Sequence, residues 1–392
     1  MKLTNYCIAL LLLAASCSTA NKISSNTIQG YEEFAANQYK ILMKNTPDDK
    51  MPVNYDPTKK SFKAAGTDWW TSGFYPGSLW LIYKATKDPV IKAEAEKRLK
   101  LEESIKYFTA NHDIGFMIFC SFGTAYTITN NPEYKDVILT AAETATKRYN
   151  ANMKAIQSWN KSAKFTAPVI IDNMMNLEML EWASQNGGSE KLAEIARNHA
   201  NTTLKNHFRS DNSSYHVIDY NPETGAVIAK RTHQGYADES AWARGQAWGL
   251  YGYTMMYRFT KDNRYLDQAH KIATFILHHP NLPKDKIPYW DFNAPDIPTA
   301  KRDASAGAII ASALLELSQY TTGKLKKEYI KDATIMIQSL STKYRSAPGA
   351  NKGFILQNSV GHLPGNSEVD VSLTYADYYY LEALDRYKTW VL

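Results

Sequence analysis

Residues 240–260 read SAWARGQAWGLYGYTMMYRFT, and residues 264–279 read RYLDQAHKIATFILHH. Both segments repeat their apolar residues at the spacing of an α-helix. The first is rich in Gly, Ala and aromatic residues on every side, so it predicts a helix that is buried almost all round. The second has a charged face and an apolar face, so it predicts an amphipathic helix that covers a core.

The same two kinds of helix alternate along the chain. Charged, amphipathic segments occupy residues 91–110, 190–208, 264–279 and 326–341, segments rich in small and apolar residues occupy 115–128, 240–260 and 303–321, and further helical segments occupy 134–149, 176–185 and 371–388. Because strand-like alternation is scarce, the sequence predicts an all-α protein. Alternating outer and inner helices suit a closed α/α barrel. The periodicity alone does not separate a six-hairpin toroid from an open superhelix of hairpins.

Composition narrows the class of protein. The 392 residues contain 45 Lys and Arg against 39 Asp and Glu, a formal charge of +6, and the two signs are interleaved. A nucleic-acid-binding protein usually concentrates its basic residues in a patch, so we expect no nucleic acid partner. Since no Pro/Gly/Ser-rich or charged linker divides the chain, we expect residues 21–392 to form a single domain.

The first twenty residues have the pattern of an export signal. Residues 7–15, CIALLLLAA, form an apolar run that is too short to span a bilayer. The run leads into LAASC (13–17), which is similar to a bacterial lipobox in which Cys17 is lipidated, whereas Ala20 also permits ordinary signal-peptide cleavage. We expect an exported, periplasmic protein whose only contact with the membrane is a lipid on Cys17. Cys120 would be the one other cysteine of the mature chain, so no internal disulfide is expected.

Polar and aromatic groups gather where the near-apolar helices begin. The motifs are GTDWWTSGFYPG (66–77), NHDIGF (111–116), PVIIDNMMN (168–176), THQGYADESAWARGQAW (232–248) and PYWDF (288–292). In an α/α barrel the inner helices run parallel, so their N-terminal ends meet around one mouth. The sequence therefore predicts one cavity that is lined by residues far apart in the chain.

Two aspartates in these motifs have two interpretations. Asp113 and Asp172 stand just before helical runs, where an Asp side chain commonly caps the helix N-terminus. However, His112 adjoins Asp113 and an apolar PVII segment precedes Asp172, and desolvation would raise a carboxyl pKa toward the range of a general acid. The two roles make opposite demands, because capping stabilises the carboxylate whereas a proton donor must stay protonated.

Arg244 and Trp248 are four residues apart and so share one face of the expected helix. The guanidinium can bind a carboxylate through two hydrogen bonds, and the indole offers an aromatic platform. The 26 Tyr, 9 Trp and 13 Phe residues suit stacking on sugars, although large helical proteins also pack many rings in their cores. The histidines lack HxxxH or HExxH spacing, so no metal site is expected.

Several of these motifs, taken together, resemble one family of enzymes. They are DWWTSGFYPGSLW, NHDIGF, IIDNMMNLEMLEWA, THQGYADESAWARGQAWGLYGY, PYWDF and the C-terminal EVDVSLTYADYYYLEAL. From about residue 30 to its end the chain resembles glycoside hydrolase family 88, the unsaturated glucuronyl hydrolases. The resemblance implies an (α/α)6 barrel and the release of a terminal 4,5-unsaturated uronic acid from oligosaccharides left by polysaccharide lyases. It also implies hydration chemistry, in which C4 is protonated and water adds at C5.

The resemblance assigns roles to positions of this sequence. It implies that Asp172 is the general acid/base and that Asp113 is the second essential aspartate. It places substrate contacts at Trp70, Phe74, His112, Trp159, His216, Thr232, Gln234, Arg244 and Trp248. Arg244 is expected to bind the uronate carboxylate. No metal or organic cofactor is expected, because one acid/base can perform both proton transfers.

Three other functions are compatible with the sequence. An unsaturated rhamnogalacturonyl hydrolase would share the barrel and the hydration chemistry but act on pectin fragments. An inverting glycosidase would cleave saturated sugars with two carboxylates. A lipid-anchored glycan-binding protein would bind oligosaccharides without turnover. Residues 341–366 give no recognisable pattern, and the sequence leaves open the polysaccharide, its sulfation, and the choice between monomer and homodimer.

Overall fold

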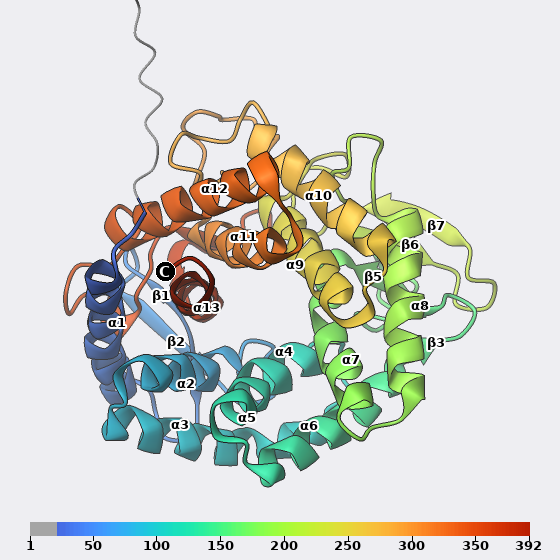
Figure 1. The fold of residues 1–392 in the computed structure, drawn as a ribbon. Helices are drawn as coiled ribbons and strands as arrows, with labels where there is room; N and C mark the ends of the chain where they lie inside the picture. The colour runs from blue at the N-terminus through green and yellow to red at the C-terminus, as the bar shows by residue number, and fades with distance from the viewer. Residues whose placement is uncertain (1–21) are drawn as a thin grey trace, which may run out of the picture.

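Helices of two kinds alternate through residues 22–392, which are the residues that the computed structural model describes (Figure 1). The expected leader, with Cys17, lies outside the described residues. The inner ring contains α2 (Phe74–Thr86), α4 (Ile114–Ile118) continued by α5 (Thr124–Thr129), α7 (Leu177–Gln185), α9 (Ala243–Thr260), α11 (Ala304–Leu317) and α13 (Thr374–Trp390). The outer ring contains α1 (Ser25–Asn45), α3 (Pro89–Glu102), α6 (Pro132–Ala145), α8 (Glu190–Asn206), α10 (Asn263–His278) and α12 (Gly323–Thr342).

The inner ring closes on itself. Helix α13, the last inner helix of the chain, packs against both α11 and α2, and α2 is the first inner helix. Each outer helix packs beside an inner neighbour in the sequence, as in the pairs α2/α3, α7/α8, α9/α10 and α11/α12 (Figure 1). The structure is therefore the closed six-hairpin (α/α)6 barrel, and the open superhelix is excluded.

Burial of the inner helices agrees with their composition. All fourteen residues of α11 are buried, and in α9 burial is continuous from Ala243 to Met256. Glycine allows the inner helices to approach closely, since a Cβ at Gly77 would lie 2.2 Å from the carbonyl oxygen of Cys120. A Cβ at Gly252 would lie 2.5 Å from the Cβ of Met174. Small residues thus place neighbouring backbones side by side.

The outer helices are amphipathic and are well capped. In α10 the buried positions follow one face of the helix, which includes Tyr265, Ala269, Ile272 and Ile276. The side chain of Asp262 accepts a hydrogen bond from the backbone N–H of Arg264 at 2.9 Å, and Asp88 and Ser189 cap α3 and α8 in the same way. Such a cap typically stabilises a helix by about 1 kcal/mol.

Several predicted helices differ in detail. The predicted 134–149 helix ends at Ala145, and a 3₁₀ helix, η3 (Thr146–Arg148), follows it. The predicted 91–110 helix ends at Glu102, and a 3₁₀ helix, η1 (Glu103–Tyr107), follows it. The predicted 115–128 helix contains a π-helical turn, η2 (Phe119–Gly123), between α4 and α5. The predicted 371–388 helix begins only at α13, because residues 367–373 form a strand.

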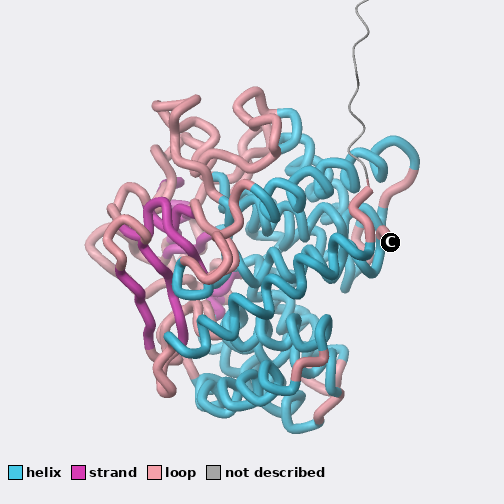
Figure 2. Tube along the Cα trace, turned by 90° about the vertical axis from the view of Figure 1, so that its left-hand side faces the viewer, coloured by secondary structure: helices cyan, strands magenta, loops and turns pink. Residues whose placement is uncertain are grey.

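Short antiparallel strands, which the sequence did not predict, cover one end of the barrel. They are β1 (Met51–Asp56), β2 (Ser61–Ala65), β3 (Tyr149–Asn150), β4 (Ala155–Ile156), β5 (Pro168–Ile170), β6 (Val217–Tyr220), β7 (Val227–Arg231), β8 (Ser359–His362) and β9 (Ser367–Leu373). They form three sheets, with strand orders β2-β1-β9-β8, β3-β4 and β5-β6-β7. Figure 2 shows them together on one side of the molecule, with the helices on the other. Because β9 leads directly into α13, this is the end at which the inner helices begin.

The described residues contain no helix that is long and apolar enough to cross a membrane.

Candidate active site

A cavity of about 300 Å³ lies at the N-terminal ends of the inner helices, beneath the strands. Its walls come from both halves of the chain. They are formed by Trp69, Trp70, His112, Asp113, Phe116, Trp159, Ile170, Asp172, His233, Gln234, Arg244, Gly361, His362, Ser367, Glu368 and Tyr375. Four of the five predicted motifs meet around this mouth, whereas PYWDF (288–292) contributes no lining residue.

Neither aspartate of the cavity caps a helix. Asp113 occupies the N-cap position of α4, yet its side chain accepts no capping hydrogen bond. Asp172 lies inside the 3₁₀ helix η4 (Ile171–Asn176), which precedes α7, and its Oδ2 is buried without a hydrogen-bond partner. The capping interpretation of both residues is therefore wrong, and their carboxyl groups are free to serve the cavity.

Burial raises the pKa of both carboxyl groups. Desolvation, together with the nearby charge of Asp172, raises the pKa of Asp113 to about 8 against the opposing effect of Arg148. Desolvation also raises the pKa of Asp172 to about 7, against the lowering effect of Arg244. The pair therefore retains a proton at neutral pH, which is the condition that a general acid must meet.

A neutral histidine faces Asp113. Burial lowers the pKa of His112 to about 3, so its ring is uncharged. Its Nδ1 accepts a hydrogen bond from the amide of Asn176 at 3.2 Å, since the amide oxygen of Asn176 is already bound by the backbone N–H of Phe116. The ring proton of His112 is therefore on Nε2, which lies 3.3 Å from Asp113 Oδ1.

A second neutral histidine faces Asp172 in the same way. Nδ1 of His216 accepts hydrogen bonds from the backbone N–H groups of His233 and Gln234, both at 3.1 Å. Its proton is therefore on Nε2, which lies 3.7 Å from Asp172 Oδ2 and makes no hydrogen bond there. Desolvation holds the pKa of His216 well below its usual value. His216 thus directs an N–H toward Asp172 without supplying a positive charge.

Arg244 brings the positive charge of the site. It begins α9, is buried, and donates through Nη1 to Asp303 Oδ2 at 3.0 Å and through Nη2 to the carbonyl of Gly361 at 2.6 Å. Its guanidinium lies 4.5 Å from the ring centroid of Trp242 and 5.3 Å from that of Tyr375. The guanidinium of Arg244 therefore lies beside two aromatic rings, those of Trp242 and Tyr375.

The structure brings most of the predicted site residues together. Seven of them line the cavity, namely Trp70, His112, Asp113, Trp159, Asp172, Gln234 and Arg244. The other four, Phe74, His216, Thr232 and Trp248, lie behind its walls.

Those four residues support the walls. Phe74 packs edge-on beneath Trp70, with centroids 6.0 Å apart, and Trp248 packs against Phe116 at 5.2 Å. The hydroxyl of Thr232 accepts a hydrogen bond from the backbone N–H of Gly235 and so shapes the loop before α9. They contact other residues of the site and do not themselves line the cavity.

Sequence reasoning missed nine lining residues. They are Trp69, Phe116, Ile170, His233, Gly361, His362, Ser367, Glu368 and Tyr375. Most belong to motifs that had been singled out without a role for each position, such as Trp69 in DWWTSGF and His233 in THQGY. Gly361 and His362 fall within residues 341–366, where no side-chain pattern indicated a function.

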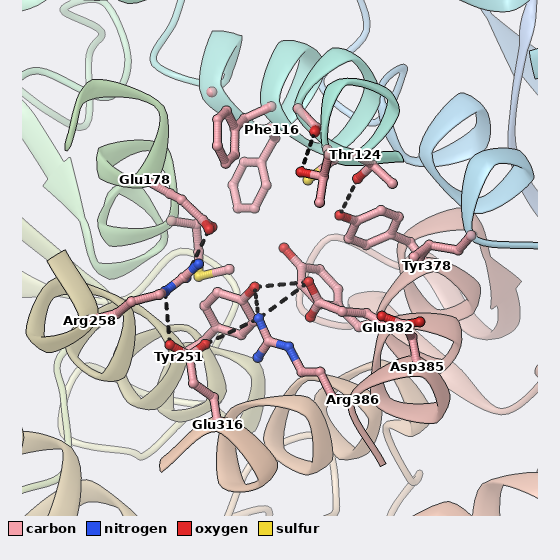
Figure 3. Close-up of a pocket in the computed structure, with 18 of the residues that line it drawn as sticks. Phe116, Thr124, Glu178, Tyr251, Arg258, Glu316, Tyr378, Glu382, Asp385 and Arg386 are labelled. Carbon is pink, nitrogen blue, oxygen red and sulfur yellow. Dashed lines mark hydrogen bonds and ion pairs between the residues drawn. The ribbon is translucent and has the colours of Figure 1, made fainter. Parts of the chain in front are cut away.

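A second cavity, of about 260 Å³, lies at the opposite end of the barrel (Figure 3). Phe116 lines both cavities and separates them. Here Arg258 lies 2.8 Å from Glu178 and 2.9 Å from Glu316, and Arg386 lies 3.2 Å from Glu316. Because both arginines are ion-paired, this network links α7, α9, α11 and α13. We therefore assign proton transfer to the first cavity and a structural role to the second.

Within residues 22–392, no three His, Cys, Asp or Glu side chains lie where they could share a metal ion.

Comparisons with known proteins agree with this geometry. The sequence profile of Glycosyl Hydrolase Family 88 matches residues 42–391. The chain is 48% identical to an unsaturated glucuronyl hydrolase of Formosa agariphila, over 82% of this chain and 81% of that protein. It is 34% identical to an unsaturated chondroitin disaccharide hydrolase of Streptococcus pneumoniae, over 82% and 83% of the two chains.

Solved structures give the same result. The crystal structure of an unsaturated glucuronyl hydrolase specific for heparin superposes with a TM-score of 0.89 at 44% sequence identity. The match covers 93% of this chain and 98% of that one. The chain belongs to glycoside hydrolase family 88.

Proposed function

We propose that the protein is an unsaturated glucuronyl hydrolase, which removes the non-reducing terminal 4,5-unsaturated uronic acid from glycosaminoglycan oligosaccharides produced by lyases. The observation that carries this function is the pair of buried, proton-holding aspartates, Asp113 and Asp172, in one cavity with Arg244. The similar unsaturated chondroitin disaccharide hydrolase of Streptococcus pneumoniae and the similar heparin-specific unsaturated glucuronyl hydrolase support this substrate class.

The substrate's own structure supplies much of the reactivity. Its C4=C5 double bond is conjugated with the C6 carboxylate and bears the ring oxygen at C5, so protonation at C4 places positive charge on C5 and that oxygen. Water then adds at C5 to give a hemiketal. The hemiketal opens by breaking the bond between C5 and the ring oxygen, which leaves a hemiacetal at C1 that expels the rest of the oligosaccharide as an alcohol. One water is consumed, as in any glycoside hydrolysis.

The cavity provides the groups that these steps require. Asp172, with its raised pKa, gives its proton to C4 and, as the carboxylate, takes a proton from the attacking water. Asp113, held by the Nε2–H of His112, orients and polarises the same ring. Arg244 binds the C6 carboxylate, and Trp70 and Trp159 border the sugar. The cycle returns Asp172 to its starting protonation state.

Loss of the ultraviolet absorbance of the C4=C5 bond tests the function directly. We expect the protein to abolish the absorbance of unsaturated glycosaminoglycan disaccharides and to leave the matching saturated uronides intact. Cleavage of saturated uronides would indicate an inverting glycosidase, and faster turnover of unsaturated pectin fragments would indicate a rhamnogalacturonyl hydrolase. Tight binding of oligosaccharides without turnover would indicate a glycan-binding protein.

We further propose that the enzyme is exported and held at the periplasmic face of a membrane by a lipid on Cys17. The support comes from the sequence alone, from the apolar run at residues 7–15 and the lipobox-like LAASC that follows it. The residues after Cys17, STANK, lack an acidic cluster. A periplasmic location would suit an enzyme that acts on fragments already released by a lyase.

A further inference from the structure

A groove on the four-stranded sheet continues from the catalytic cavity. It has a volume of about 440 Å³ and is lined mainly by β1, β2 and the β8–β9 hairpin. Ser367 and Glu368 line both the cavity and the groove, so the two spaces adjoin. The groove is therefore the direct extension of the site for any substrate longer than the cavity can hold.

Trp69 stands at the rim where this extension begins. It lines the catalytic cavity, yet 39% of its surface is exposed, unlike the buried rings below it. Its backbone is fixed, because its N–H donates to the carbonyl of Gly66 and its own carbonyl accepts from Ser72. An exposed indole on a rigid turn costs little entropy to order, which suits the stacking of a sugar ring.

Lys63 brings a positive charge to the same place. It lies on β2, lines the groove, and holds its Nζ 4.2 Å from the centroid of the Trp69 ring. Within the described part of the chain, that indole is the one partner of the Lys63 ammonium. An exposed ammonium without a carboxylate partner is available to an anionic group.

The other charges of the groove are already neutralised or bound. Lys59 pairs with Asp56 at 3.2 Å, and the carboxylate of Glu368 accepts a hydrogen bond from the amide of Asn54 at 2.7 Å. Lys63 is opposite Asn54 in the pairing of β1 with β2. Among the described residues that line the groove, Lys63 is thus the unpaired cation, and it lies beside the exposed ring of Trp69 at the edge of the catalytic cavity.

We propose that Trp69 and Lys63 form an additional sugar-binding subsite for the part of the oligosaccharide beyond the terminal disaccharide unit. A sugar of that part stacks on Trp69, and its carboxylate or sulfate binds the ammonium of Lys63. This proposal rests on the proposed function, since it concerns the same substrate. It makes the enzyme prefer acidic oligosaccharides longer than a disaccharide.

The test compares unsaturated disaccharides with unsaturated tetrasaccharides of the same glycosaminoglycan, unsulfated and sulfated. We expect a lower KM for tetrasaccharides than for disaccharides in the wild-type enzyme. Lys63→Met should reduce kcat/KM for tetrasaccharides by about 5-fold to 30-fold and change that for disaccharides by less than 2-fold. Trp69→Ala should reduce kcat/KM for tetrasaccharides by a similar factor, and by clearly more than it reduces that for disaccharides. Trp69→Phe should restore much of the loss, because a phenyl ring also stacks.

Lys60→Met is the matched control, since Lys60 is an exposed lysine of the same hairpin that does not line the groove. A larger effect of Lys63→Met on sulfated tetrasaccharides identifies sulfate as the bound group, and an equal effect identifies the carboxylate. Equal losses on both substrate lengths, or no loss on tetrasaccharides, would overturn the subsite. A wild-type enzyme that turns over no unsaturated substrate would instead overturn the function itself.

Discussion

Arg244 and Asp303 form an ion pair at which neither side chain is more than 1% exposed, with Nη1 and Oδ2 3.0 Å apart. The other carboxylate oxygen of Asp303 accepts hydrogen bonds from the N–H and hydroxyl of Ser305 at the start of α11. A single carboxylate therefore caps the inner helix α11 and holds the cavity-lining guanidinium of the neighbouring inner helix α9. Substitution of Arg244 should affect both substrate binding and stability.

Arg244→Ala should lower kcat/KM by a factor that corresponds to roughly 2–4 kcal/mol of lost transition-state stabilisation. The main effect should be a higher KM, because the uronate loses a charge-assisted hydrogen-bond partner in a buried site. It should also destabilise the protein by about 3–5 kcal/mol, since Asp303 is left buried without its partner. Kinetics and thermal unfolding of the purified variant check both effects. Unchanged KM in a folded variant would place the carboxylate elsewhere.

Arg244→Lys separates the two effects. The ammonium keeps the charge opposite Asp303 but cannot reproduce the planar fork that also reaches the carbonyls of Val360 and Gly361. We expect stability to recover more than KM.

Asp172→Asn should reduce turnover by at least ~10²–10⁴-fold, because the amide retains the shape of the side chain but transfers no proton. The substitution should not destabilise the protein, since Asp172 caps no helix. Turnover by the wild-type enzyme in heavy water should place deuterium at C4 of the product. Protium at that carbon, or near-normal turnover by the variant, would remove Asp172 from the mechanism.

Activity should fall as the pH rises through about 7 to 8, because Asp172 and Asp113 then lose the proton that the reaction requires. A pH profile of kcat/KM for the wild-type enzyme measures this limb. Persistence of full activity well above pH 8 would contradict the role of the pair as proton donor.

The same raised pKa values make stability depend on pH. In the unfolded chain an Asp titrates near about 3.9, so below that pH the carboxyls are neutral in both states and burial carries no charge penalty. As the pH rises from there to the folded pKa of Asp113, about 8, the unfolded chain releases a proton that the folded protein retains, so stability falls across this range and levels off above it. Asp113→Asn should therefore gain stability over wild type between pH 4 and pH 8, as measured by unfolding at a series of pH values.

The ion-pair network at the far end of the barrel should be structural. Arg386→Met removes a partner of Glu316 and Glu382 and should destabilise the protein by about 3–5 kcal/mol. Arg264→Met, at an exposed pair with Asp262, is the control and should cost less than about 1 kcal/mol. The kcat/KM of folded Arg386→Met on disaccharides should remain near wild type, and a large loss would link this network to catalysis.

Lipidation of Cys17 predicts that the wild-type protein fractionates with membranes and that Cys17→Ala is released in soluble form. Fractionation of expressing cells followed by immunodetection measures the difference. Equal solubility of the two proteins would favour cleavage near Ala20.

Much of the helical scaffold could be predicted from the sequence, because helical periodicity and the contrast between small-residue and charged segments are local properties. Residues 240–260 and 303–321 show this, since α9 and α11 are buried almost throughout. The short strands could not be predicted, because a strand such as β5, three residues long, is defined by its partner and not by its own pattern.

The sequence predicted those site residues that belong to recognisable motifs. Asp113, Asp172 and Arg244 lie where the motifs placed them, around one cavity. The sequence did not predict the contribution of residues 341–366, because much of it comes from the backbone. The carbonyls of Val360 and Gly361 accept hydrogen bonds from Arg244, and a pattern of side chains does not reveal backbone contacts. Likewise, the position of His216 depends on β6, the strand that it directly precedes. The pairing of β6 with β5 fixes this position, and the sequence alone does not define that pairing.

The parallel inner helices also give the barrel an electrostatic direction. Each helix carries a partial positive charge at its N-terminus and a partial negative charge at its C-terminus, and the six inner units all begin at the catalytic end. Their aligned dipoles favour an anionic sugar at that end before any side chain touches it. At the other end, Arg258 lies in the last turn of α9 and Arg386 near the end of α13, where cations offset the opposite pole. The same arrangement that gathers the catalytic residues thus draws the uronate toward them.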